Sequence, residues 1–165
     1  MPTTDGPPAE WDLVERIAVP STEEYGPGDE ANGLRVCFAQ SPTGAVVAAY
    51  NMAGQFSSSE LALDAYEEFL ASGPGRDALL ASFEPSTISD DLSVQLAGFQ
   101  LLEFSTDRAV VDLVARGSNG AIVSTPVHLV WEDGDWRVSL QDNGQPFIAP
   151  RSVPSLAGYI EWAGA

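Results

Sequence analysis

The side chains able to do acid–base chemistry are few, and one pair of them falls in a pattern that suggests a site. His128 is the only histidine of the sequence, and Asp112 lies on the strand expected beside it. An imidazole and a carboxylate in one pocket could act as a general base and its partner. The sequence has no G-x-S-x-G, P-loop, H-E-x-x-H or dinucleotide-binding motif. We therefore expect a half-exposed strand histidine, with an enzyme that uses His128 and Asp112 as the alternative.

Three acidic residues, Glu132, Asp133 and Asp135, are close enough together to suggest a cation site. A calcium loop needs more oxygen ligands than this turn offers, and the spacing does not match an EF-hand. We therefore expect a solvent-exposed hairpin tip. Arg76 follows Gly-Pro-Gly and could bind an anion, but the acidity of the chain favours a local salt bridge with the acids of the preceding helix.

The single cysteine, Cys37, excludes an internal disulfide and any metal site built from several cysteines. Its neighbours Val36 and Phe38 are apolar, so we expect Cys37 to be buried as a small apolar residue. The sequence thus predicts no catalytic residue, no metal ligand and no cofactor.

The charge of the chain excludes two classes of partner. The 165 residues include 24 acids and 7 bases, all arginine, for a net charge of −17. Such a surface repels the phosphates of nucleic acids and anionic membranes. The length suits one domain, and we expect a flexible linker over residues 1–10 followed by a single folded domain over residues 11–165.

Helix signals lie in the first half of the chain. Ser41 is a strong N-cap and Pro42 suits the first helical position. Alanines and larger apolar residues then recur on one face, at Ala45, Ala48, Ala49, Met52 and Phe56. A second helix is expected to begin with a capping box formed by Ser57 and Glu60 and to end at residues 73–74. A short third helix is expected over residues 76–83.

Strand signals dominate after about residue 92, where apolar residues recur with a period of two. We expect an antiparallel meander over residues 94–104, 109–116, 121–131 and 136–140. A hairpin loop over residues 132–135 places Trp131 and Trp136 opposite each other on one face. Residues 11–19 are expected to form a strand or short helix, and the apolar C-terminal tail is expected to dock back onto the domain.

Helices followed by a meander indicate an α+β fold. The expected architecture is a nuclear-transport-factor-like (cystatin-like) cone, in which about three N-terminal helices pack on a curved antiparallel sheet of four or more strands. Other α+β sandwiches are the alternatives.

An apolar patch is expected on the sheet face that the helices leave free. Its members lie on neighbouring strands and are Val110, Val114, Ile122 and Val130. Monomeric proteins rarely expose contiguous patches of this kind. We therefore expect a surface for a partner protein or for self-association, or a surface that the C-terminal segment with Tyr159 and Trp162 covers within the chain.

Several segments together resemble an uncharacterised actinobacterial domain family, found in membrane proteins encoded on conjugative and integrative elements. The segments are VPSTEEYGP (19–27), GLRVCFAQSPTGAVVAAYNMA (33–53), GPGRDALL (73–80), HLVWEDGDWRVSLQDNG (128–144) and SLAGYIEWAGA (155–165). The resemblance implies an extracytoplasmic domain similar to the cone-fold inner-membrane scaffold subunit of type IV secretion systems. It carries over no catalytic residue.

The expected function is a non-enzymatic extracytoplasmic scaffold or interaction domain of a conjugative DNA-transfer apparatus, with other protein subunits as partners. The sequence shows no signal peptide and no apolar run of about 18–20 residues. The resemblance implies an anchor that is absent from this sequence, and a cytoplasmic, soluble protein is the alternative. The alternative functions are a small cone-fold isomerase or dehydratase and a cytoplasmic ligand-binding module.

Overall fold

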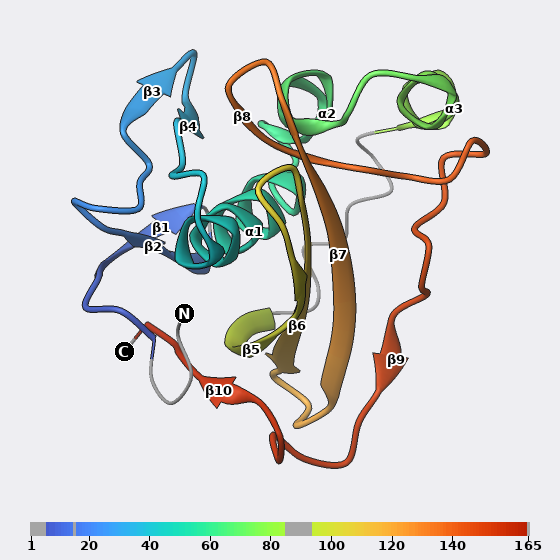
Figure 1. Ribbon diagram of the computed structural model, residues 1–165. Helices are drawn as coiled ribbons and strands as arrows, with labels where there is room; N and C mark the ends of the chain where they lie inside the picture. The colour runs from blue at the N-terminus through green and yellow to red at the C-terminus, as the bar shows by residue number, and fades with distance from the viewer. Residues whose placement is uncertain (1–5, 15, 85–93, 165) are drawn as a thin grey trace.

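A long antiparallel sheet with one helix lying across its face dominates the fold (Figure 1). The computed structural model describes residues 6–14, 16–84 and 94–164, so residues 1–5 of the expected linker lie outside the described residues. The main sheet runs in the order β10 (Ile160–Glu161), β5 (Val94–Phe104), β6 (Arg108–Gly117), β7 (Ile122–Glu132) and β8 (Asp135–Val138), and β9 (Arg151–Ser152) pairs with the other end of β7.

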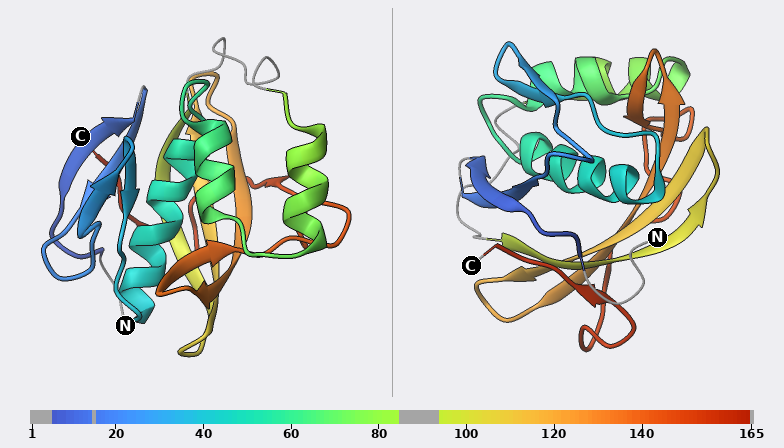
Figure 2. Two further views of the ribbon diagram at one scale, coloured as in Figure 1. Left: turned by 90° about the horizontal axis from the view of Figure 1, so that it is seen from above. Right: turned by 60° about the vertical axis from the view of Figure 1, so that its left-hand side comes forward.

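Two small hairpins and three helices complete the described chain. The hairpins are β1 (Glu10–Val14) with β2 (Ile17–Ser21) and β3 (Asp29–Ala31) with β4 (Leu34–Val36); the helices are α1 (Pro42–Phe56), α2 (Ala62–Phe69) and α3 (Pro74–Ser82). In Figure 2 (left), the β1–β2 hairpin lies on one side of α1, and α2 lies between α1 and α3.

The expected cone is wrong. The described chain is mainly strand, with a six-stranded main sheet, and its three helices do not pack together on a cone-like sheet. Helix α1 packs on β5 and β6, whereas α2 contacts α1 and β8, and α3 contacts α2. The ambiguous segments before residue 41 form two hairpins, which cover the side of α1 that a cone would leave to solvent.

Helix α1 begins as expected and is buried all round. The Ser41 hydroxyl oxygen accepts the Gly44 N–H at 3.0 Å, which confirms the N-cap. Residues 42–56 contain no charged side chain, and a helix without a polar face is normally a core helix. Its far side meets β2 so closely that a Cβ on Gly54 would lie 2.5 Å from Cγ1 of Val19. The alanines predicted one buried face on this helix, whereas the structure buries the helix on all sides.

Two buried amides of α1 hold the N-terminal hairpins in place. Asn51 donates from Nδ2 to the carbonyl of Pro20 in β2 at 2.9 Å, and its Oδ1 accepts from Nε of Arg35 at 2.7 Å. Gln55 accepts the backbone N–H of Arg35 in β4 at 2.8 Å. Both amides are fully buried, so these bonds compensate the loss of water around them.

The break between α1 and α2 lies where expected, but the cap is not Ser57. Ser57 ends α1 and donates its hydroxyl to the carbonyl of Ala53 at 2.8 Å. Helix α2 begins at Ala62, and the hydroxyl oxygen of buried Ser58 accepts the Leu61 N–H at 3.2 Å. Ser57 belongs to the end of α1, and α2 begins five residues later at Ala62, so Ser57 is too far from the first turn of α2 to cap it.

The β7–β8 hairpin confirms the tryptophan pair. Trp131 and Trp136 are cross-strand partners, their ring centroids are 5.2 Å apart, and the planes meet at 81°. The loop is tighter than expected, because Glu132 and Asp135 already pair and Asp133-Gly134 turn the chain with positive φ angles of 53° and 81°. Asp-Gly is a favoured pair for such a turn.

The sequence predicted a solvent-exposed hairpin tip, but the two acids that flank this turn are hydrogen-bonded to other segments of the chain. Glu132 accepts the backbone N–H of Ser72 at 3.1 Å and also accepts the Ser72 hydroxyl. The carboxylate of Asp135 accepts the backbone N–H groups of Cys37 and Phe38 at 2.9 and 3.1 Å. The hairpin is thereby tied to both the α2–α3 connection and the segment that leads into α1.

Two further expectations need correction. Cys37 is exposed, with a positive φ of 68°. Partial desolvation of its thiol and the nearby carboxylates of Asp135 and Asp29 raise its pKa. Apolar neighbours in sequence did not bury it because the backbone turns at this residue. Arg76 donates to the main-chain carbonyl of Glu67 at 3.0 Å, in place of the expected salt bridge with a helix acid.

Ser41→Ala should lower the free energy of unfolding by about 0.5–2 kcal/mol, because it removes the cap of the central helix. Ser57→Ala at the other end of α1 is the matched control and should change it by less than about 0.5 kcal/mol. Urea unfolding followed by circular dichroism measures both. Equal losses in the two variants would contradict the assignment of the cap.

Acid should weaken the hairpin anchor. The hydrogen bond from the Ser72 hydroxyl lowers the pKa of Glu132, and Arg137 and Arg76 act in the same direction. A carboxyl whose pKa is lower in the folded state stabilises the fold above its unfolded pKa, and this contribution is lost as the pH falls through the folded pKa. Between about pH 5 and pH 3, Glu132→Gln should therefore lose less stability than the wild type. Ser72→Ala should likewise reduce the dependence of the free energy of unfolding on pH. If both variants keep the wild-type dependence, the Glu132–Ser72 hydrogen bond does not cause it.

Candidate functional site

The sheet face turned away from α1 carries the residues expected to form a site. Side chains alternate along a strand, so β6 presents Val110, Asp112 and Val114 on this outer face, while Val111 and Leu113 join the core around α1. The register places His128 of β7 opposite Val110 and Ser124 opposite Val114; Ile122 and Val130 lie on the same face, near its two ends.

The C-terminal segment divides this outer face into two parts. Strand β9 pairs with β7, and β10 pairs with β5 at the opposite edge of the sheet. Residues 153–159 must therefore cross the outer face between the two edges, and the right view of Figure 2 shows the red segment on the side of the sheet away from α1. In the part of the outer face that this segment crosses, Val114 is fully buried and Ile122 is half-buried. The expected patch is thus not one continuous exposed surface.

Tyr159 fastens this crossing segment to the sheet. Its hydroxyl donates to Oδ2 of Asp112 at 2.7 Å, and the Ser124 hydroxyl donates to Oδ1 at 2.6 Å. Asp112 is 2% exposed, so both carboxyl oxygens are satisfied by hydroxyl groups in place of water. Trp162, which was also expected on this face, packs instead against Tyr50 in the core, with ring centroids 4.9 Å apart.

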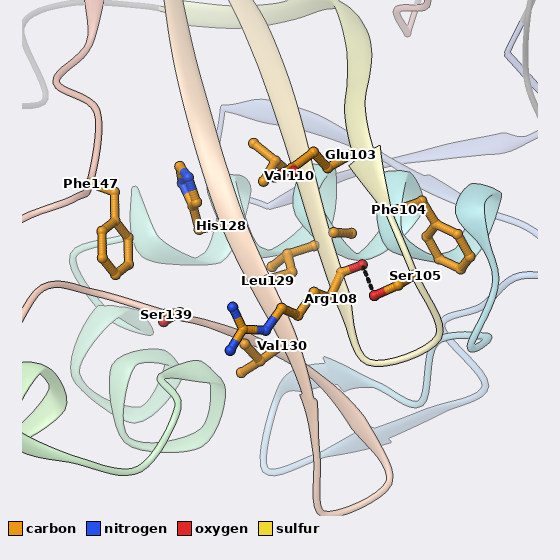
Figure 3. A pocket seen from close by; sticks show the side chains of 11 residues that line it. Glu103, Phe104, Ser105, Arg108, Val110, His128, Leu129, Val130, Ser139 and Phe147 are labelled. Atoms are coloured by element: carbon orange, nitrogen blue, oxygen red, sulfur yellow. Dashed lines mark hydrogen bonds between the residues drawn. The ribbon is translucent and has the colours of Figure 1, made fainter.

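An open pocket of about 620 Å³ remains at the other end of the outer face (Figure 3). Its walls come from the β5–β6 turn, β7 and the chain that follows β8. It is lined by Glu103, Phe104, Ser105, Arg108, Ala109, Val110, His128, Leu129, Val130, Ser139 and Phe147. Of the four patch residues, the structure brings Val110 and Val130 together here. We call this cavity the outer pocket.

Of the eleven residues that line the outer pocket, five are polar or charged and six are apolar. In Figure 3, Arg108 extends over Val130 toward Ser139, on the side of the pocket away from Glu103. Phe147 is 48% exposed and faces the His128 ring, with centroids 5.0 Å apart. Burial lowers the pKa of His128, opposed in part by the charge of Glu103, so the imidazole is neutral near pH 7.

The structure gives His128 and Asp112 different partners. The imidazole packs on Phe147 in the outer pocket, whereas the Asp112 carboxyl is occupied by Ser124 and Tyr159 under the crossing segment. The alternative in which the two pair as base and orienting acid is therefore not what this geometry provides.

Other kinds of site find no support in the described part of the chain. No three of its histidine, cysteine, aspartate and glutamate side chains gather in a way that could hold a metal ion. Of the described helices, none combines the length and hydropathy that a membrane span requires.

Sequence reasoning missed Arg108 and Phe147 as members of the site. Arg108 lies two residues before Val110, and strand alternation places both on one face. Phe147 and Ile148 form an apolar pair within the otherwise polar segment QDNGQPFIAP. Such a pair can indicate an exposed binding residue, but from the sequence we used it only to predict that the tail docks onto the domain.

Tyr159→Phe should lower the free energy of unfolding by about 1–3 kcal/mol, because it leaves a buried oxygen of Asp112 without a donor. Tyr66→Phe is the control, since no hydrogen bond of the Tyr66 hydroxyl is found in the described part of the chain, and it should change stability by less than about 0.5 kcal/mol. Chemical denaturation measures both variants. A stable Tyr159→Phe variant would refute the role of this hydroxyl as the fastener of the C-terminal segment.

Three comparisons with known proteins bear on the family of the chain. A search of curated proteins and a search of solved structures both returned no match. A family model described as a domain of unknown function, DUF8175, matches residues 1–161. Because this match covers nearly the whole chain, the protein belongs to the DUF8175 family.

Proposed function

We propose that this domain is a non-enzymatic interaction module that binds a partner protein through the outer pocket. The observation that carries the proposal is that exposed Phe147 and Arg108 line the same pocket as the apolar side chains of Val110 and Val130 (Figure 3). Aromatic and arginine side chains around an apolar centre are the groups that most often dominate the binding energy of protein interfaces. Ile148, next to Phe147 in sequence, is also 44% exposed and widens the apolar surface.

Charge restricts which partners suit this surface. The net charge of −17 repels acidic proteins at long range and favours the approach of neutral or basic ones. The partner we propose therefore presents an apolar side chain to the outer pocket from a neutral or basic surface.

The proposed setting is the extracytoplasmic side of a conjugative DNA-transfer apparatus, with the domain held at the membrane by an anchor outside this sequence. The support for this setting is the resemblance of segments such as residues 33–53 and 128–144 to proteins of conjugative elements. The observed sheet is not the cone of the type IV secretion scaffold subunit, so the proposed setting does not include likeness to that subunit.

The test replaces Phe147 or Val130 by a photo-cross-linking amino acid in donor cells that carry the element. Both positions should yield cross-links to a protein of the transfer apparatus. Leu13 is 71% exposed on β1 and serves as the control position, at which no such product should form.

In the same cells, Phe147→Asp and Val130→Asp should each lower the frequency of DNA transfer roughly tenfold or more, the effect of losing one interface hot spot. Leu13→Asp should leave it unchanged. If both pocket variants fold, as judged by circular dichroism of the purified domain, and transfer DNA at the wild-type frequency, the proposed function is wrong.

A further inference from the structure

A second cavity lies on the opposite side of the sheet, between the helices and the inner face. Its volume is about 440 Å³, within the range of about 300–1,000 Å³ that is typical of small-molecule sites. All three helices and strands β5 to β8 contribute to its walls. Three alanines, Ala49, Ala53 and Ala115, leave space between α1 and the sheet that larger side chains would fill. We call this cavity the inner pocket.

The lining of the inner pocket carries no charge near pH 7. None of its described lining residues is an aspartate, glutamate, lysine or arginine. Tyr66 and His128 are the titratable groups among them. Burial raises the pKa of Tyr66 and lowers that of His128, so both side chains are neutral.

The few hydrogen-bonding groups of the inner pocket lie toward solvent. Ser57 is exposed, and Tyr66, Thr125, His128 and Ser139 are half-buried, whereas Ala49 and Met52 are fully buried. Water held beside Ala49 and Met52 therefore has few polar partners, and an apolar group that displaces it gains free energy. The inner pocket suits a ligand with an apolar body and at most a hydroxyl group at the mouth.

The charge of the molecule narrows the ligand class further. An anionic head group, such as the carboxylate of a fatty acid, would meet no cation in the lining and would approach a chain of net charge −17. We propose that the inner pocket binds an uncharged apolar small molecule. His128, Ser139 and Phe147 line both pockets, whereas Val110, Val130 and Arg108 line only the outer one, so this inference stands apart from the proposed function at those three residues.

The test titrates the purified chain with N-phenyl-1-naphthylamine, a neutral probe that fluoresces in apolar surroundings, and then displaces it. We expect saturable binding at one site. The neutral alcohol 1-dodecanol should displace the probe at a concentration roughly tenfold lower than dodecanoate, which has the same chain with a charged head.

Ala53→Leu should weaken probe binding roughly tenfold, because the added side chain fills the pocket beside α1. Ala81→Leu makes the same change on the exposed face of α3, outside the lining, and should bind the probe as the wild type does. If Ala53→Leu fails to fold, Ala53→Val adds less volume to the same place and should weaken binding in the same direction.

Three results would overturn the proposal. They are the lack of saturable binding, wild-type probe affinity in a folded Ala53 variant, and displacement by dodecanoate as good as that by dodecanol. Val130→Asp separates this test from that of the outer pocket, because it should abolish partner binding and leave probe affinity unchanged.

Discussion

Helix α1 is buried on every side, and a helix in that position must satisfy each polar group it carries. The two amides that break its apolar surface, Asn51 and Gln55, are satisfied by the main chain of β2 and β4 and by Arg35. These bonds decide where the N-terminal hairpins lie. The hairpins in turn cover the side of α1 that the sheet leaves open, so the remainder of the fold is arranged around this helix.

The C-terminal segment places a second constraint on the molecule. Its path from the β7 edge to the β5 edge obliges it to cross the outer face, and it does so over Asp112, the carboxyl that Tyr159 and Ser124 share. At Gly98 of β5 the arriving chain comes so close that a Cβ would lie 2.6 Å from the Ile160 carbonyl oxygen. The crossing removes Val114 from the surface and leaves the outer pocket as the open part of that face.

The two pockets lie on opposite faces of one sheet and share a wall formed by His128, Ser139 and Phe147. Their chemistry differs. The outer pocket has an arginine and an exposed aromatic ring, residue types that are enriched in protein interfaces, whereas the described lining of the inner pocket is uncharged. Both surfaces are suited to binding, and among the described residues His128 and Asp112 take different partners.

Local signals in the sequence determined several elements of this protein. Ser41-Pro42 set the start of α1, Asp133-Gly134 set the β7–β8 turn, and the period of two assigned the faces of β6 and β7. Each of these depends on residues a few positions apart, where backbone geometry is decided by the side chain itself or by its near neighbours.

Only the tertiary structure decided the layers and the pockets. The burial of α1 on both sides, the crossing segment and the position of Phe147 depend on contacts between distant residues, such as that of Tyr159 with Asp112, 47 positions away. The lack of charge in residues 42–56 and the apolar pair Phe147-Ile148 were visible in the sequence, yet they do not say what the helix or the pair will pack against. Packing of the whole chain selects those neighbours, because burial and hydrogen bonding are optimised together over all elements and cannot be evaluated one segment at a time.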